Sequence, residues 1–272
     1  MTYETYSLSA PLNLFITHFT YYKNYTPFHS IDRFLPNGNT EIVIDLTDSP
    51  KYIYDNKSLS EIQACNKLWV SGVRTNFITI PSGRDSEMFV INFRKGKVYP
   101  FLGLPLCEIS DKVIDGDLIL HKAFLELREQ LLDCELTANK FRIAERLLMR
   151  NFISKLSVNA VIEYAVKQII DEPEVAVIKS IANKTGYSSK HLIHLFEKNV
   201  GVTPKTFLRI IRFQKAVQEI QQKGQVNFAR LALDCGYFDQ SHFIADFRAF
   251  SGFTPAEYQK KKNDLADYVP VR

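Results

Sequence analysis

Length, composition and charge describe a chain that folds around one large core or two ordinary ones. Its 272 residues are 46% hydrophobic with a formal net charge of +4, which excludes a disordered polyelectrolyte. The first residues, MTYET, lack the basic start and apolar run of a signal peptide, and no stretch approaches the roughly 18 apolar residues that span a bilayer. We therefore expect a cytoplasmic protein with no membrane partner.

The first 116 residues are expected to form a β-rich domain. Strand-like runs at 41–46, 77–80 and 88–93 are separated by turn signals at 36–39, 71–72, 81–83 and 95–97. Many short strands at this spacing predict a small barrel or sandwich. Trp69, Tyr99 and Phe101 are candidates to line a ligand cavity, and ordinary core packing is the alternative.

Helical periodicity begins after residue 116, so the fold class is α+β. Residues 117–156 are predicted to be linker or dimerisation helices, with one apolar stripe at Leu120, Phe124, Leu127 and Leu131. Such a stripe packs either on its own domain or on a second copy, and we favour its own domain. Asp171-Glu172-Pro173 then ends a helix, because a proline disfavours helical geometry in the residue before it.

The cysteines predict no disulfide framework. Cys65, Cys107, Cys134 and Cys235 are scattered and contain no C-x-x-C pair, a pattern that suits a reducing compartment. We expect ordinary buried thiols, and a redox sensor is the alternative.

Basic charge is concentrated near the C-terminus. Residues 174–262 carry 14 Lys and Arg against 7 Asp and Glu, whereas residues 1–173 carry 19 against 21. This segregation favours a polyanionic partner, and a solvated basic face is the simpler alternative.

The same region contains an internal repeat. Ile181-Ala182-x3-Gly186-Tyr187 recurs as Leu231-Ala232-x3-Gly236-Tyr237 at an offset of 50 residues. At an offset of 51 the matches continue in order: Leu192 with Phe243, Phe196 with Phe247, Gly201 with Gly252, Thr203-Pro204 with Thr254-Pro255, and Phe207 with Tyr258. These ordered matches indicate a duplicated unit.

Each unit predicts a short helix, a glycine turn and a second helix. Gly186 and Gly236 stand where a helix needs a left-handed residue to end, while Ser188 or Ser189 and Asp239 can cap the next helix. This arrangement places a second helix in the DNA major groove. A helix from Thr203-Pro204 to about Gln222 joins the units, and 19 residues at 1.5 Å each span about 28 Å, which approaches the roughly 34 Å helical turn of DNA.

These motifs resemble the DNA-binding domain of the AraC/XylS family of bacterial transcription regulators over residues 157–262. The matching pieces are Ser180-Ile-Ala-x3-Gly-Tyr-Ser-x2-His-Leu-x2-Leu-Phe196, Gly201-x-Thr-Pro204, Gly236-Tyr-x-Asp-Gln-Ser-His-Phe-x3-Phe247 and Gly252-x-Thr-Pro-x2-Tyr258. The N-terminal half more weakly resembles sensory domains of the family, at 35–38, 41–46, 72–75 and 99–102. The resemblance implies a cupin-like β domain that binds an effector or dimerises, without the His-x-His metal pattern of cupins.

The resemblance also assigns roles to residues of the two second helices. It implies base reading by Ser189, Lys190, Ile193 and His194 in the first unit, and by Gln240, Ser241, Ile244 and Ala245 in the second. The family often has arginine where His194 and Ala245 stand, so bidentate reading of guanine by arginine is absent at both positions. From their charge, Lys184, Lys205, Arg209, Arg212, Arg230 and Arg248 are candidates for phosphate contacts.

No catalytic, cofactor or metal signature accompanies these motifs. His18, His29, His121, Glu41 and Asp45 are too far apart in sequence for a metal pattern, and no phosphate loop, nucleophile elbow or dinucleotide fingerprint occurs. We therefore predict a sequence-specific, non-enzymatic transcription regulator without a cofactor, controlled through its N-terminal domain.

The expected partner is double-stranded DNA, and a small-molecule effector, a second copy of the chain and RNA polymerase are further candidates. Two alternative functions stay open: an enzyme with a DNA-targeting tail, and an oligomeric protein that binds nucleic acid without selectivity. The effector, the operator, the regulated genes, the sign of regulation and the oligomeric state are not encoded in any motif. Residues 263–272 are predicted to be a separate C-terminal tail.

Overall fold

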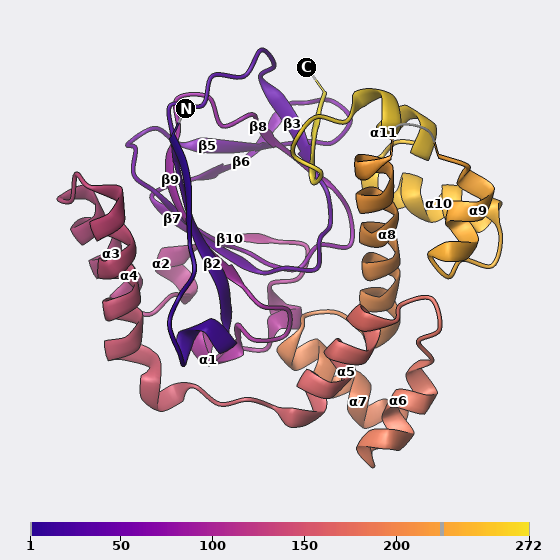
Figure 1. The fold of residues 1–272 in the computed structure, drawn as a ribbon. Coiled ribbons are helices and arrows are strands. Elements are labelled where there is room, and N and C mark those ends of the chain that lie inside the picture. Colours follow the sequence, from indigo (N-terminus) through magenta and orange to yellow (C-terminus); the bar gives the residue numbers. More distant parts are fainter. Residues whose placement is uncertain (1, 224–225, 272) are drawn as a thin grey trace.

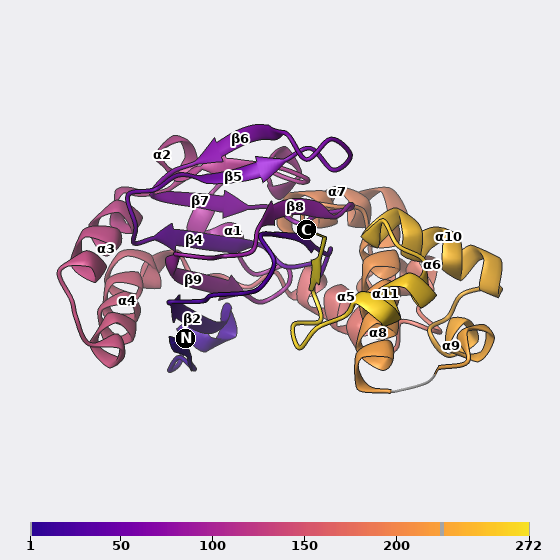
Figure 2. The same ribbon diagram turned by 90° about the horizontal axis from the view of Figure 1, so that it is seen from above.

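The N-terminal half is a sandwich of two antiparallel sheets, as a computed structural model describing residues 2–223 and 226–271 shows (Figures 1 and 2). The expected barrel or sandwich is therefore a sandwich. The first sheet has the order β1 (Thr2–Tyr6), β2 (Ile16–Lys23), β9 (Glu87–Phe93), β4 (Glu41–Asp45), β7 (Leu68–Ser71) and β10 (Val113–Asp115). The second has the order β11 (Tyr268–Pro270), β3 (Ile31–Phe34), β8 (Ile78–Pro81), β5 (Lys51–Tyr54) and β6 (Glu61–Cys65).

Alternation along the strands gives the first sheet two different faces. In β4, Ile42 and Ile44 are fully buried in a core on the helical side, while Glu41 and Val43 line a cavity on the other side. Strand β9, and β2 from His18 onward, follow the same period of two, which is the period of side chains in a strand; a register shift between Ile16 and His18 interrupts it in β2. The first sheet thus separates a hydrophobic core on its helical side (the dry core) from the cavity on its other side.

The dry core is closed by helices from the middle of the chain. They are α1 (Tyr99–Leu102), α2 (Gly116–Ile119), α3 (Lys122–Leu132) and α4 (Thr137–Phe152), with the short 3-10 turns η1 (Leu12–Leu14), η2 (Leu106–Glu108) and η3 (Ile153–Lys155). Phe124, Leu127 and Leu131 are fully buried against this sheet. The apolar stripe therefore packs on its own domain, the alternative that the sequence favours.

The C-terminal half is helical. It contains α5 (Ala160–Asp171), α6 (Ile178–Thr185), α7 (Ser189–Asn199), α8 (Pro204–Gln222), α9 (Phe228–Asp234), α10 (Gln240–Ser251) and α11 (Pro255–Lys261). Helix α8 has 19 residues; it begins directly after its N-cap residue Thr203 and ends at Gln222, as its sequence predicts. Its buried residues cover more than one side because α5 to α7 lie at one end and α9 to α11 at the other (Figure 1).

The two halves are packed against each other. Leu35 and Val73 of the β-rich half belong to the buried core of the helical half. A Cβ at Gly38, where φ is 75°, would stand 3.3 Å from Phe207 of α8. The C-terminal segment returns to the β-rich half, where β11 pairs with β3. Residues 263–272, predicted to be a separate tail, thus contribute a strand to the second sheet.

The cysteines match their prediction in part. Cys65 and Cys235 are buried, and burial raises the pKa of their thiols to about 11 and about 12. Cys107 is exposed and Cys134 is half-buried, so the prediction of buried thiols is wrong for Cys107. Cys107 follows Leu106, the residue of η2 that faces the core, and turns outward because consecutive residues of a 3-10 turn face different sides.

Candidate DNA interface and effector cavity

The first unit is formed by α6 and α7. Helix α6 ends at Gly186, whose φ of 75° is the left-handed geometry that a non-glycine residue adopts only at a cost. The hydroxyl of Ser188 then accepts the backbone N–H of His191 and caps α7. Leu192 and Phe196 are fully buried, which orients the opposite face of α7 toward solvent.

The second unit repeats this geometry with α9 and α10. Gly236 has a φ of 80° after the end of α9, and the carboxylate of Asp239 accepts the backbone N–H of His242 at 2.7 Å. Phe243 and Phe247 are fully buried. Both units therefore present the N-terminal part of a capped helix, with its backbone N–H groups and positive dipole end, to the outside.

Seven of the eight residues expected to read bases are exposed. They are Ser189, Lys190, Ile193 and His194 on α7, and Gln240, Ser241 and Ala245 on α10. Ile244, the remaining residue of this set, is half-buried and packs against the helical core. The cause is its position beside Phe243, on the edge of the buried face.

The six candidates for phosphate contacts divide into two groups. Lys184, Lys205, Arg230 and Arg248 are exposed. Arg209 instead forms a bidentate pair with Asp246 of α10, through its Nε at 3.1 Å and its Nη2 at 2.7 Å. Arg212 donates to the backbone oxygens of Pro173 and Glu174. Arg209 and Arg212 thus connect elements of the helical half to one another.

Asp246 is a residue that the sequence reasoning missed. It is 6% exposed and lies between Phe243 and Phe247 on the buried face of α10. An acidic residue within an otherwise apolar stripe was the available signal, because a buried charge needs a partner. Its pairing with Arg209 fixes α10 to the connecting helix α8.

A cavity of about 400 Å³ lies between the two sheets, a size typical of small-molecule sites. Trp69 lines it, as one of the two readings of the sequence proposed. Phe101 instead packs against Phe15, Phe93 and Phe152 in the dry core. Tyr99 lies away from the cavity, where the ammonium of Lys198 stands 5.0 Å from its ring centroid.

The cavity lining is largely apolar and aromatic but carries ionisable groups. Asp32, Glu41, Lys51, His18 and Asp267 reach it. Burial lowers the pKa of His18, which favours its neutral form. Burial, together with the nearby Asp267 carboxyl, raises the pKa of Glu41 to about 7. The pKa of a buried carboxyl such as Glu41 shifts when another charge is placed beside it.

The described residues are 2–223 and 226–271. They contain no group of three His, Cys, Asp or Glu side chains placed to hold a metal ion. Within the same ranges, every helix is too short or too polar to cross a membrane.

Comparisons with known proteins agree on the helical half. Residues 181–261 match the model of a helix-turn-helix domain, and residues 4–115 match a domain of unknown function. The probable transcription factor PqrA of Proteus vulgaris is 32% identical over 83 residues, which are 30% of this chain and 67% of that protein. An uncharacterised helix-turn-helix regulator of Haemophilus influenzae is 30% identical over 83 residues.

These similarities cover different shares of the proteins compared. The matched segment spans only 28% of the length of the Haemophilus influenzae regulator and 30% of this chain. Among solved structures, ToxT from Vibrio cholerae covers 96% of this chain and 98% of its own, with a TM-score of 0.47 and 12% identity.

Proposed function

This chain belongs to the AraC/XylS family of transcription regulators, and on that premise we propose that it reads one extended DNA site with α7 and α10 while its β-rich half binds an effector. The observation that carries this proposal is the pair of capped helices with exposed N-terminal faces at opposite ends of α8. Two linked readers in one chain suit an asymmetric site, so a monomer suffices for specific binding.

The two reading helices offer different chemistry to DNA. On α7, Lys190 and His194 supply hydrogen-bond donors, and Ile193 supplies an apolar surface for a thymine methyl group. On α10, Gln240 can pair with adenine through two hydrogen bonds, while Ala245 offers only a methyl group. We propose that the first unit contributes most of the sequence selectivity.

Phosphate contacts are proposed for Lys184, Lys205, Arg230 and Arg248, the four basic candidates with exposed side chains. Each contact formed adds about 0.9 to the slope of log affinity against log salt. These contacts set affinity and register, and base contacts set selectivity.

Selection from a random duplex library by the purified protein tests the proposal. We expect one enriched motif of two half-elements, weakened when Lys190→Ala or His194→Ala is used. Each lost base contact is worth about 1 to 3 kcal/mol of discrimination. Lys122→Ala, at an exposed position on α3 outside both units, is the matched control. Equal retention of all sequences by a folded protein contradicts selective reading and favours nonselective binding.

The cavity between the sheets supports the effector part of the proposal. It has the volume and mixed lining of a small-molecule site. For the ligand to control DNA binding, it must have different affinities for two conformations of the chain.

A further inference from the structure

One wall of the cavity is supplied by the C-terminal segment, residues 263–271. Tyr268 pairs with Phe34 and Pro270 with Asp32, so β11 extends the second sheet. Leu265, Asp267 and Tyr268 line the cavity. Val269 turns the other way and is fully buried in the core of the helical half. This segment therefore touches both the cavity and the DNA-binding half.

Asp267 connects the cavity directly to the connecting helix. Its Oδ2 accepts the side-chain amide of Asn37 at 3.3 Å, and its Oδ1 accepts the Nε2 of Gln214 at 3.0 Å. Gln214 belongs to α8 and also donates to the backbone oxygen of Pro36 at 2.8 Å. A ligand group that attracts the Asp267 carboxylate thus acts on a hydrogen bond that holds α8.

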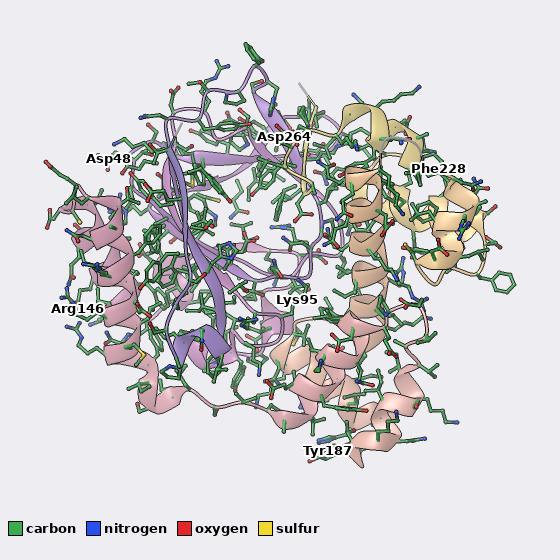
Figure 3. All side chains as sticks on the ribbon, viewed as in Figure 1. Asp48, Lys95, Arg146, Tyr187, Phe228 and Asp264 are labelled. Atoms are coloured by element: carbon green, nitrogen blue, oxygen red, sulfur yellow. The ribbon has the colours of Figure 1, made fainter. Side chains whose placement is uncertain are left out.

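The charges at this end of the cavity are unequal. Two of the lining carboxyls, Glu41 and Asp267, lie close enough to influence each other; among the described residues, the cation Lys95 acts on both of them and the cation Arg74 acts on Glu41. The ammonium of Lys95 donates to the Oδ1 of Asn39 at 2.6 Å, and Lys95, which is not a lining residue, lies between the sheets and α8 (Figure 3). Neither Lys95 nor Arg74 lines the cavity, so at this end the two carboxyls are the charged groups that a ligand meets.

The other charged groups of the lining are already paired. Asp32 stands 2.9 Å from the Nε2 of His29, and the ammonium of Lys51 stands 3.9 Å from the buried carboxylate of Asp45. Each of these lining groups thus has a partner within the fold. The lining thus leaves Glu41 and Asp267 without a lining cation beside them, which favours a positively charged ligand group at their end of the cavity.

Aromatic side chains surround the same hollow. Electron-rich ring faces attract an organic cation, most strongly where water is excluded. The buried hydroxyl of Ser82, 6% exposed, also lines the cavity and has no hydrogen-bond partner among the described residues, which marks a polar contact left for a ligand. The aromatic residues of the lining are Tyr3, Tyr22, Tyr25, Phe34, Tyr52, Trp69 and Tyr268.

We propose that this cavity binds an organic cation, an amine on an apolar or aromatic body, with its ammonium between Glu41 and Asp267. The proposal rests on the effector role of the β-rich half and names the chemical class of the effector. Binding draws Asp267 toward the ammonium and weakens its bond to Gln214, so occupancy of the cavity changes how the C-terminal segment and α8 are held together.

A charge series tests the ligand class without DNA. Tryptamine, tryptophol and indole-3-acetate share one aromatic body and carry a positive, zero and negative charge; phenethylamine, phenethyl alcohol and phenylacetate repeat the series on a smaller body. Titration calorimetry of the full chain at pH 7.5 should show at least tenfold tighter binding of the amine than of its neutral partner in one series. Preference for the anion, equal binding of all three, or binding of neither amine overturns the proposal.

Variants that remove a lining carboxylate test where the ammonium of the bound amine lies. Glu41→Gln and Asp267→Asn keep the shape of the lining and remove a charge, so each should reduce the preference for the amine to less than threefold. Glu61→Gln and Asp264→Asn are matched controls at exposed positions of β6 and of the same C-terminal segment. Unchanged preference in both cavity variants places the cation elsewhere and overturns the assignment.

The coupling is tested by Gln214→Leu, which leaves the lining carboxyls in place. In the parent, the amine should change affinity for the selected DNA site at least threefold, whereas Gln214→Leu should bind the amine without changing its DNA affinity. An equal response in both proteins overturns the role of Gln214, and no response in the parent overturns the coupling. Because the amine titration contains no DNA, its result stands independently of whether the chain selects a DNA sequence.

Discussion

Two acidic residues lie inside this protein under opposite conditions. Asp246 has the guanidinium of Arg209 on both of its oxygens. Glu41 faces a hollow that it shares with a second carboxyl, and burial raises its pKa to about 7. The charge of Asp246 is compensated by Arg209 within the fold, whereas the carboxyl of Glu41 faces the cavity in which we propose that a ligand binds.

Glu41 should make the stability of the fold depend on pH. Its protonated form contributes stability that is complete below a pH of about 4.5 and is lost as the pH rises through about 7. Relative to Glu41→Gln, the parent should therefore lose up to about 3 kcal/mol between pH 5 and pH 8, at about 1.36 kcal/mol for each pKa unit. Urea unfolding of both proteins at the two pH values measures this difference.

Several charged groups bear on the ionisation of Glu41, so the comparison needs a matched variant. Glu61→Gln, at an exposed position in β6, should show no such difference between the two pH values. A parent and a Glu41→Gln variant with parallel pH dependence would contradict the raised pKa. The ionisable groups that face Glu41 from neighbouring elements are Tyr22, Arg74, Lys95, Asp267 and Tyr268.

Asp246 should matter for stability more than an exposed partner does. Asp246→Ala removes the acceptor of Arg209 and loosens α10 from α8, at an expected cost of about 1 to 3 kcal/mol. Asp234→Ala breaks an exposed pair with Arg230, at 3.7 Å within α9, and should cost less than about 0.5 kcal/mol. Chemical denaturation compares the two, and similar losses would refute a structural role for the Arg209 pair.

At the residue scale, sequence predicted exposure better than pairing. The period of α7 and α10 follows from Leu192, Phe196, Phe243 and Phe247, so most residues on the opposite face were found. The pairing of Arg209 joins residues 37 positions apart, a separation that no local pattern encodes. For the same reason the two cavity carboxyls, Glu41 and Asp267, come together only in the folded chain.

The glycines that end the first helices of the two units show how equivalent sequence positions acquire different surroundings. Both have a left-handed φ, 75° at Gly186 and 80° at Gly236. A Cβ at Gly186 would meet nothing within 4 Å. A Cβ at Gly236 would stand 2.5 Å from the Cα of Glu174, in the segment between α5 and α6. The second turn is therefore packed against backbone.

Substitution by alanine should separate these two positions. Gly186→Ala carries only the cost of a left-handed alanine, about 1 to 2 kcal/mol. Gly236→Ala carries the same cost and must also displace backbone at Glu174, so it should lose at least about 1 kcal/mol more. Thermal and urea unfolding measure both variants, and equal losses would show that the 174 segment moves away without cost.

Elements built from local signals were predicted well, and elements built from distant pairing were not. The caps at Ser188 and Asp239 and the whole of α8 follow from nearby residues. Strand β11 has three residues and forms only because β3, more than 230 positions earlier, offers a free edge. Its sequence, Tyr-Val-Pro, carries too short a pattern to reveal that partner.

At the scale of the molecule, the two halves share buried surface. Arg33 of β3 is central to it, because its guanidinium lies 4.4 Å from the ring centroid of Phe77 and 4.4 Å from that of Phe253. Phe77 belongs to the β-rich half and Phe253 to the second helix-turn-helix unit. Together with β11, this contact connects the unit that carries α10 to the domain that contains the cavity.

Such packing predicts that the halves unfold together. Trp69 is the only tryptophan in the sequence and reports on the β-rich half, while circular dichroism at 222 nm reports mainly on α5 to α11. The two signals should give superimposable transitions in the parent. Arg33→Met keeps an apolar stem but removes the cation, and should lower both midpoints by the equivalent of about 1 to 2 kcal/mol. The control is Arg146→Met on the exposed face of α4 (Figure 3), which should leave both midpoints unchanged. A midpoint shift confined to one of the two signals would mean that the halves unfold independently. In that case a ligand in the cavity would need another route to the DNA-binding helices.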